Sequence, residues 1–515
     1  MTSDGLPSGL GVELTIDSIL ASLRLKGITV WRDRGQLRYR CVKGSVGPAD
    51  LALLKEHKLK ILAYLTGAEV SQSAPLSFSQ IWHWRMFELE HRTSFRGSAR
   101  AFRLLGTVDE SALRSSLLQV VERHAALRTR IVKTSALPFQ DISGAIEDRL
   151  RVYDLTGTTE QTGESQRIID EIILEPVNFD CDPLFTVALM RLGAYEHVLL
   201  IAVDHMISDA ISASIVFTDL LTLYGCAIDV VKERLPALAV QFAEFSTWQQ
   251  HNKQNWVKCD GPYWDGLLRR GDLTRFPISS DALAEKGGLG VINFCLPQDV
   301  SAQLARFSRS NQMTMAQCSF GAYAAAVSLW CDMADIVVQS QTTGRGIPGL
   351  ESTVGYFASL LGIGVHISAR DTFGDLLLQV KEEYCRALER TDHSYMARQL
   401  DRGAFCRNVV FNWIPRRSLY GNSMSRHSEL GISIEPMEFI HPLHDDSKNS
   451  VVMDLDPELI LSDELDGIRG QICFAQTRFS SAEMSRLAQL FVQVLQTLSY
   501  ETNSRVRDVV LTVTV

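Results

Sequence analysis

The sequence predicts a mixed α/β fold with a small N-terminal unit and a larger body. Its 515 residues exceed the roughly 250–300 that one hydrophobic core usually serves, so two or three compact units are expected. A helix–hairpin–helix pattern fills residues 1–68, and helical and strand patterns alternate from Leu76 to the end of the chain. The short, partly polar stretch 69–75 between them is a natural linker.

The N-terminal unit can be followed element by element. An amphipathic helix is expected over about 15–26, with Gly27 as its end. Alternating apolar and polar residues over 28–42, interrupted by turn-forming residues at 33–35, predict a β-hairpin. A second helix should begin near Gly47 and bury several leucines.

This unit is basic, although the whole chain is acidic. Residues 1–68 hold ten Lys or Arg and six Asp or Glu, a net charge of +4, within a chain whose total is -9. Four of these cations lie on or beside the hairpin: Arg32, Arg34, Arg38 and Arg40. An exposed basic strand edge can accept an acidic peptide as an added strand. Ordinary surface charge on a solvated hairpin is the alternative.

The body contains one stretch with several residues that could take part in catalysis. The apolar run Val198–Val203 predicts a buried strand, and apolar residues at helical spacing follow from Asp209. Polar side chains at the end of a buried strand are held in place by their rigid neighbours and can point into a cleft. His205 could take a proton there, because histidine titrates near neutral pH. A capping turn with no catalytic role is the alternative on these residues alone.

The N-terminal unit resembles the TubC-type docking domains of peptide assembly lines. The resemblance is carried by Val30–Arg40 and by Leu53–Lys58. It implies that the unit binds the short, often acidic C-terminal tail of an upstream assembly-line protein, with the hairpin arginines as the contact residues.

The stretch Asp204–Ser212 resembles the HHxxxDG motif of nonribosomal peptide synthetase condensation domains, which are relatives of chloramphenicol acetyltransferase. His205 matches the second, catalytic histidine, and Asp209 matches the aspartate. Further blocks agree in order along the body: Leu76–Gln80, Arg123–Thr129, Phe179-Asp180, Phe242–Phe245, Gly344-Arg345, Gly355–Phe357 and Val410–Trp413. The resemblance implies two acetyltransferase-like lobes in a V, at about 76–255 and 256–515, with a central tunnel.

The same resemblance implies a reaction and its partners. An upstream carrier protein would deliver an acyl or peptidyl thioester, and a downstream carrier an aminoacyl amine, each on a phosphopantetheine arm that this chain does not itself bind. His205 would act on the amine, Asp209 would pair with Arg345 in a structural salt bridge, and Asn412 would line the tunnel. The run 506–511 is similar to the usual approach to an adenylation domain, so the chain is expected to be part of a larger synthetase.

Two departures from the motif leave alternatives open. Asp204 stands where the family has its first histidine, and Ala210 stands where it has glycine. Because Asp204, Asp209 and Ser212 also fit the DxxxxDxxS motif of heterocyclization domains, a domain that cyclises Cys, Ser or Thr is a rival hypothesis. The third hypothesis is a non-catalytic platform that recruits a carrier or a tailoring enzyme.

Composition excludes other classes. The net charge of -9 and the lack of a long basic run argue against nucleic acid as the main partner. No apolar stretch approaches the ~20 residues of a membrane span, and no signal-peptide pattern opens the sequence. The ten cysteines lack metal-ligand spacing. A cytoplasmic protein without a metal site is expected, monomeric as an isolated chain.

Overall fold

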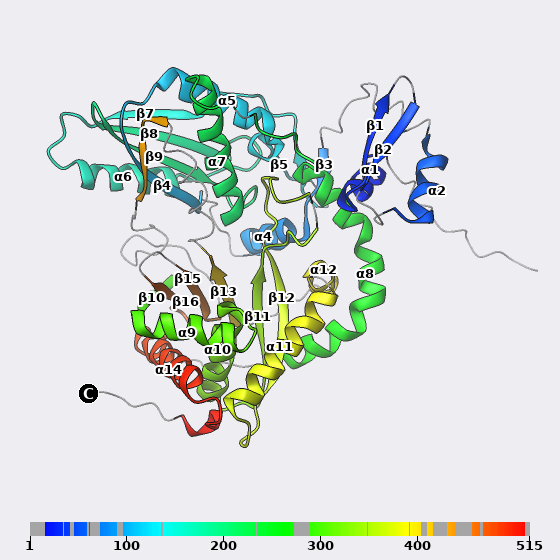
Figure 1. Cartoon of the computed structure of the whole chain (residues 1–515), viewed down its shortest axis with the longest axis vertical. Helices are drawn as coiled ribbons and strands as arrows, with labels where there is room; N and C mark the ends of the chain where they lie inside the picture. Colours follow the sequence, from blue (N-terminus) through cyan, green and yellow to red (C-terminus); the bar gives the residue numbers. More distant parts are fainter. Residues whose placement is uncertain are drawn as a thin grey trace, which may run out of the picture.

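The computed structural model describes most of the chain. The described residues are 16–33, 36–41, 46–58, 61, 73–89, 96–134, 137–232, 234–271, 289–347, 349–390, 392–402, 409–415, 430–437, 456–463 and 467–509. They form a small N-terminal unit and two larger lobes. The two lobes lie one above the other in Figure 1.

The N-terminal unit is a helix–hairpin–helix structure, as expected. Its elements are α1 (Ile16–Leu25), β1 (Thr29–Asp33), β2 (Gln36–Arg40) and α2 (Pro48–Glu56). Gly27 has φ 72°, a left-handed conformation that ends α1 at little cost. Ile19, Leu23 and Leu54 are buried in its own small core. The unit therefore has the helix, hairpin and helix in the predicted order.

The first lobe is a three-layer structure. Its sheet has the order β14-β4-β9-β8-β7. The strands are β4 (Ser98–Leu105), β7 (Leu150–Asp154), β8 (Phe185–Gly193), β9 (Glu196–Val203) and β14 (Ser433–Met437). The helices are α5 (Glu110–Arg123), α6 (Gln161–Leu174) and α7 (Ala210–Ala227). Helices α5 and α7 cover one face, whose core includes Phe102, and α6 covers the other, whose core includes Ala101.

Polar contacts to a largely buried carboxylate join α5 to α7. Arg123 and His124, at the end of α5, both bond the Asp219 carboxylate of α7, each at 2.8 Å. Helix α7 is long and apolar enough to cross a membrane by length and composition, but 56% of it is buried inside the protein, as in a core helix.

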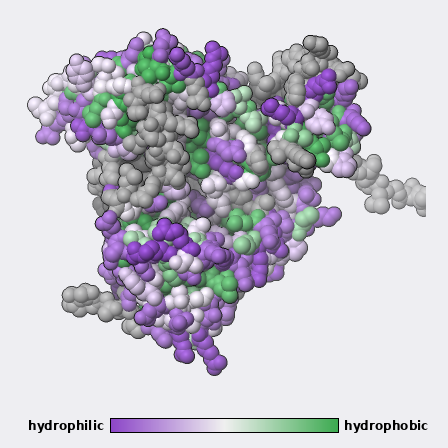
Figure 2. Space-filling model, in the orientation of Figure 1, coloured by the Kyte–Doolittle hydropathy of each residue, from purple (hydrophilic) through white to green (hydrophobic). Residues whose placement is uncertain are grey.

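The second lobe is built on a six-stranded sheet with the order β10-β16-β15-β13-β11-β12. Its strands are β10 (Leu289–Leu296), β11 (Asp335–Thr342), β12 (Ser359–His366), β13 (Val409–Ile414), β15 (Glu458–Asp463) and β16 (Ile468–Ala475). Its helices are α9 (Gln298–Ser310), α10 (Met315–Cys331), α11 (Phe373–Glu389), α12 (Asp392–Arg402) and α14 (Ser481–Tyr500), followed by the turn η5 (Val506–Asp508). Figure 2 shows hydrophilic residues over much of the outer surface of this lobe.

Shorter elements connect the lobes. They are β3 (Ser73–Pro75), β5 (Arg130–Val132), β6 (Phe139–Asp141), the turn η1 (Ala125–Arg128) and α4 (Phe78–Leu89). The three strands form a small sheet in the order β3-β6-β5. Helix α4 lies between the two lobes in Figure 1.

Two features cross between the lobes. Helix α8 (Phe242–Gly271) is continuous, so the lobe boundary expected at 255/256 falls inside it. Strand β14 comes from the second half of the chain but pairs antiparallel with β4 in the first lobe. Helix α8 also contacts the N-terminal unit, because Arg24 of α1 forms an ion pair with Glu244 of α8. Leu25 of α1 is part of the large hydrophobic core of the two lobes.

Candidate active site

The candidate site forms where β9 ends and α7 begins. Strand β9 is buried along almost its whole length and ends at Val203. Asp209 then caps α7, because its carboxylate accepts the Ser212 N–H at 2.7 Å. The turn between them presents His205, which is exposed although both of its neighbours are buried. A rigid strand and a capped helix therefore hold this histidine on a short loop.

Hydrogen bonds on one side of the ring determine its tautomer. His205 Nδ1 lies 3.2 Å from the Ser208 carbonyl oxygen and 3.4 Å from Ser98 Oγ. Because a carbonyl oxygen can only accept, Nδ1 carries the proton in the neutral ring. No described residue forms a hydrogen bond with Nε2, so this nitrogen keeps a lone pair.

The surroundings of His205 favour its neutral form. Desolvation lowers the pKa of His205 as the largest effect, with a smaller lowering from the charge of Arg100. The Ser208 carbonyl and the charge of Asp209 act in the opposite direction. The side chain is thus exposed within the chain and yet surrounded by enough protein to be strongly desolvated.

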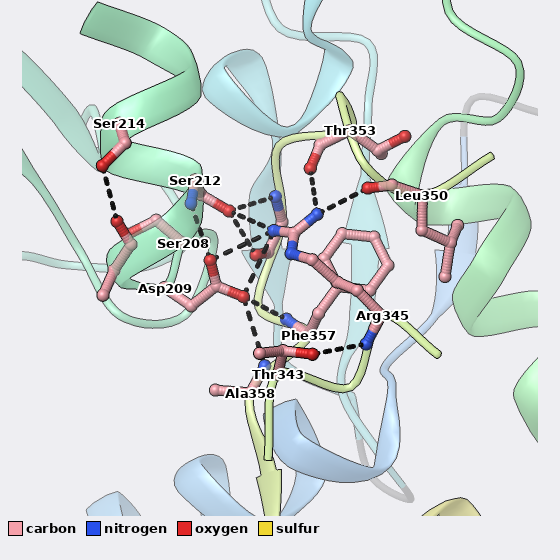
Figure 3. A network of polar contacts seen from close by, with 12 residues as sticks. Ser208, Asp209, Ser212, Ser214, Thr343, Arg345, Leu350, Thr353, Phe357 and Ala358 are labelled. Carbon is pink, nitrogen blue, oxygen red and sulfur yellow. Dashed lines mark hydrogen bonds and ion pairs between the residues drawn. The ribbon is translucent and has the colours of Figure 1, made fainter. Parts of the chain in front are cut away.

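Asp209 and Arg345 form a buried ion pair that joins the two lobes (Figure 3). Arg345 Nη2 lies 3.1 Å from Asp209 Oδ1, and the two side chains are 6% and 4% exposed. Asp209 also accepts the backbone N–H groups of Phe357 and Ala358 at 3.1 and 3.2 Å. The salt bridge expected from the resemblance is present, and it holds the start of α7 against the second lobe.

Arg345 is occupied by structural contacts. Its Nη1 donates to the carbonyls of Leu350 and Thr353, both at 2.7 Å, and its guanidinium lies over the Phe357 ring at 4.1 Å (Figure 3). Gly344 precedes it with φ 63°, and a Cβ there would lie 1.8 Å from the Phe357 carbonyl oxygen. Only glycine fits this position, which explains the Gly-Arg pair of the block.

Ser212 belongs to the same network. Its hydroxyl donates to the Gly355 carbonyl at 2.7 Å and accepts from Gly355 N at 3.1 Å and from Arg345 Nη2 at 2.9 Å. A hydroxyl has one donor and two acceptor sites. All three are used, so Ser212 connects the lobes.

The Asp204 carboxylate bonds the backbone of the turn. Its side chain is fully buried, and Oδ1 accepts the Met206 N–H at 2.7 Å. Burial lowers the pKa of the Arg96 guanidinium, and the charge of Glu175 opposes this lowering more than the charge of Asp204 does. The charges that act on His205 are those of Asp209 and Arg100. Asp204 therefore stabilises the turn through its hydrogen bond with the Met206 N–H.

The structure brings in residues to which motif analysis gave no role. The rings of His83, on α4, and Tyr356 lie 6.3 and 5.7 Å from the His205 ring, and 5.9 Å from each other. Asn412, on β13, forms a hydrogen bond with Glu458, the first residue of β15. His83 and Glu458 carry no local motif, because packing between distant segments places them here.

The hairpin arginines are only partly described. Arg38 and Arg40 are exposed on β2 and lie on the same face of the hairpin, since they are two residues apart on one strand. Arg32 lies on β1, but its side chain is outside the described residues, as is the whole of Arg34. The described part of the unit therefore presents at least two exposed cations on one strand.

Other kinds of site are less well supported. Among the described residues, no group of three His, Cys, Asp or Glu side chains could hold a metal ion. An apolar cavity lies between β4, β14, α5 and α7, where Leu104, Leu199 and Ile432 line it. It is separate from His205, and its apolar lining offers no group for chemistry.

Comparison with known families divides the chain into the same N-terminal unit and body as the structure does. Residues 70–514 match the condensation domain family, and residues 16–66 match the TubC N-terminal docking domain. Among curated proteins, a plipastatin synthase component of Bacillus subtilis is 27% identical over 473 residues, 90% of this chain. A linear gramicidin synthase component of Brevibacillus parabrevis is 25% identical over 82% of this chain. The chain spans only 17% and 8% of the lengths of these two relatives.

Solved structures share the fold of the body. The first condensation domain of the calcium-dependent antibiotic synthetase superposes with a TM-score of 0.66 at 20% identity, over 86% of this chain and all of the other. The X-domain from teicoplanin biosynthesis gives 0.69 at 21% identity, over 86% of this chain and 99% of that one. An epimerization domain from the third module of a tyrocidine synthetase gives 0.67 at 19% identity, over 85% and 99%.

These neighbours have different roles on one architecture, so the likeness establishes the fold, and the activity has to be argued from the site. The buried Asp209–Arg345 pair and the histidine turn lie within the part of the chain that the family match covers. The chain belongs to the condensation domain family and carries a TubC-type docking domain at its N-terminus.

Proposed function

We propose that this protein forms an amide bond between two carrier-bound substrates in nonribosomal or hybrid polyketide–peptide synthesis. The observation that carries the proposal is the state of His205. Its Nδ1–H is held by the Ser208 carbonyl, its pKa is lowered by desolvation, and its Nε2 is left to accept a proton. A neutral imidazole with a free nitrogen suits a residue that acts on an amine.

The chemistry balances without a further reactant. The acceptor amine attacks the donor thioester carbonyl, the C–N bond forms, and the C–S bond breaks. The amine proton passes to His205 Nε2 and then to the leaving thiolate on the upstream carrier arm. Holding two tethered reactants together supplies much of the rate. Asp209, Arg345 and Ser212 support the loop, while Asn412 lines the passage.

The rival enzyme hypothesis has less support in the site. Heterocyclization would use the pattern Asp204, Asp209 and Ser212, but the contacts of all three are structural. The platform hypothesis keeps one argument: the fold is shared with an X-domain solved in a complex with OxyB. We favour condensation, because a non-catalytic platform has no need of a histidine held in this state.

The partners follow from the two domains. Carrier proteins on the upstream and downstream sides would deliver phosphopantetheine arms, and an adenylation domain would follow. The docking domain would bind an acidic C-terminal tail through Arg32, Arg34, Arg38 and Arg40. A cytoplasmic, monomeric isolated chain belongs to the same proposal.

Intact-protein mass spectrometry of the downstream carrier tests the reaction. A mass gain equal to the donor acyl group supports condensation, and the same gain less one water supports heterocyclization. The His205→Ala protein should give no gain while keeping the wild-type melting temperature. The matched control is His251→Ala, which removes an exposed histidine on α8 and should leave the product unchanged. No gain with the wild-type protein and loaded, cognate carriers would favour the platform.

A further inference from the structure

The first turn of helix α4 is buried and is capped by its own side chains. Ser77, the residue before the helix, is buried, and Gln80 is fully buried. The Ser77 N–H donates to Gln80 Oε1 at 2.8 Å, and the Gln80 N–H donates to Ser77 Oγ at 3.2 Å. Because a backbone N–H can only donate, this reciprocal cap identifies the oxygen of the Gln80 amide and leaves its nitrogen for other partners.

The amide nitrogen of Gln80 bonds the backbone of the histidine turn. Its Nε2 donates to the Met206 carbonyl at 2.9 Å and to Gln140 Oε1 of β6 at 3.3 Å. Gln140 is itself held, since its Nε2 donates to the Pro75 carbonyl at 2.8 Å and to Ser246 Oγ of α8 at 2.9 Å. An amide nitrogen has two N–H groups, and both are used in each of these glutamines. The Gln80 side chain is therefore held in one orientation on the Met206 carbonyl.

Met206 directly follows the histidine, and both of its backbone polar groups are bonded. Its N–H donates to the Asp204 carboxylate at 2.7 Å, and its carbonyl accepts from Gln80. Because peptide units are planar, fixing the N–H before this residue and the carbonyl after it fixes the two backbone dihedral angles of Met206. Two residues later, the Ser208 carbonyl lies 3.2 Å from His205 Nδ1. The backbone path from the ring to the carbonyl that sets its tautomer thus depends on the Gln80 contact.

The same turn of α4 also bonds the second lobe. Ser79 Oγ donates to the Ala358 carbonyl at 2.8 Å, and the Ala358 N–H is one of the donors to Asp209. Neighbouring side chains of one helix thus bond the histidine turn of the first lobe and the segment that leads into β12. Helix α4 therefore sets where the turn lies relative to the second lobe.

We propose that Gln80 is a positioning residue for amide formation, which holds His205 in its Nδ1–H tautomer and in place through the Met206 carbonyl. The proposal rests on the condensation function, because the His205 ring is taken to act on the acceptor amine. Gln80 bonds the backbone of the turn, and the ring meets the substrate. Without the amide, the buried Met206 carbonyl loses its donor, and the turn gains a reason to rotate toward another one.

Gln80→Met tests this, because methionine keeps the unbranched shape of glutamine but cannot donate a hydrogen bond. With loaded carriers, kcat should fall about 10- to 100-fold, as expected for a displaced catalytic group, while KM for the acceptor carrier stays within about twofold. Histidine-selective nitrogen NMR should show the Nδ1–H tautomer of His205 in the wild-type protein and a mixture of tautomers in the variant. The His205 signal is identified by its absence in His205→Ala.

The matched control is Gln161→Met, in the first turn of α6. Gln161 Nε2 donates to the carbonyls of Leu155 and Leu192, at 2.9 and 2.7 Å. Leu192 lies at the end of β8 opposite to Phe185, which pairs with Val203 beside the turn. This variant also leaves backbone carbonyls without a donor, so it should lower the melting temperature but keep kcat and the His205 signal.

A second variant serves if Gln80→Met does not fold. Gln80→Asn keeps the amide, but its side chain is one methylene too short to bond the Ser77 N–H and the Met206 carbonyl together. It should therefore lower kcat and alter the His205 signal in the same direction as Gln80→Met.

Each result decides the proposal. An unchanged kcat in the folded Gln80 variant overturns it, and so does a fall in kcat with an unaltered His205 signal. An equal fall in kcat in Gln161→Met also overturns it, because general destabilisation would then explain both losses. If the wild-type protein forms no amide, the proposed function fails, and the His205 signal alone decides whether Gln80 holds the ring.

Discussion

Replacing Arg345 with alanine should destabilise the protein far more than it changes the histidine. The side chain bonds the Asp209 carboxylate, the Ser212 hydroxyl, and the carbonyls of Leu350 and Thr353. Its loss leaves a carboxylate that is 4% exposed without its cation. Breaking a buried pair by removing one partner costs about 3–5 kcal/mol.

This cost should be visible as a lower melting temperature. Domains of 150–250 residues lose roughly 2–4 °C per kcal/mol, so a drop of about 5 °C or more is expected. Arg386→Ala is the control, because Arg386 is 54% exposed and pairs with glutamates on its own helix. Such a surface pair is worth about 0–1 kcal/mol. The two arginines thus differ in burial and not in charge.

Thermal unfolding followed by circular dichroism measures both variants. A double variant, Asp209→Asn with Arg345→Met, should recover part of the loss, because it removes both buried charges together. The reasoning is refuted if Arg345→Ala melts within about 1 °C of the wild-type protein, since the predicted cost is several kcal/mol. It is also refuted if the double variant is as unstable as the sum of its own single variants, Asp209→Asn and Arg345→Met, since the pair would then not be coupled.

Three further predictions follow from the site and the docking domain. The imidazole of His205, followed by histidine NMR, should titrate with a midpoint below 6.5, because desolvation disfavours its charged form; a midpoint at or above 6.5 contradicts this. Asp204→Ala should cost about 1–3 kcal/mol of unfolding free energy by leaving the buried Met206 N–H unpaired, whereas Asp204→Asn should cost less; equal losses in urea titrations would argue against the capping role. Charge reversal at both Arg38 and Arg40 should weaken binding of an acidic peptide, as should added salt; a salt-independent affinity would count against an electrostatic contact.

Local elements were predictable from the sequence because local patterns determine them. The apolar run 198–203 lies within β9, and Asp209 caps α7, as the change of periodicity indicated. The hairpin at 28–42 is present as β1 and β2. In each case the signal lies within about ten residues, where propensity and turn chemistry act directly.

Features that depend on tertiary packing were not predictable. Strand β14 joins the sheet of the first lobe through pairing with β4, more than 300 residues earlier in the chain. His83 reaches the site on α4, and no spacing rule relates it to His205. Glu458 looks like an ordinary strand-end residue until the β13–β15 register pairs it with Val410, two residues before Asn412. Only the assembled sheet reveals these neighbours.

Two carboxyls, one in each lobe, differ in how far their surroundings compensate the charge. Asp209 accepts the N–H groups of Ser212, Phe357 and Ala358 and is paired with Arg345, so its charge is fully compensated. Any substrate group that approached it would have to displace one of these partners. Burial raises the pKa of Glu458 to about 7, against the lowering effect of the Asn412 amide, and no described cation pairs with it. The compensated carboxylate therefore holds the lobes together, whereas the β15 carboxyl has one neutral donor among the described residues.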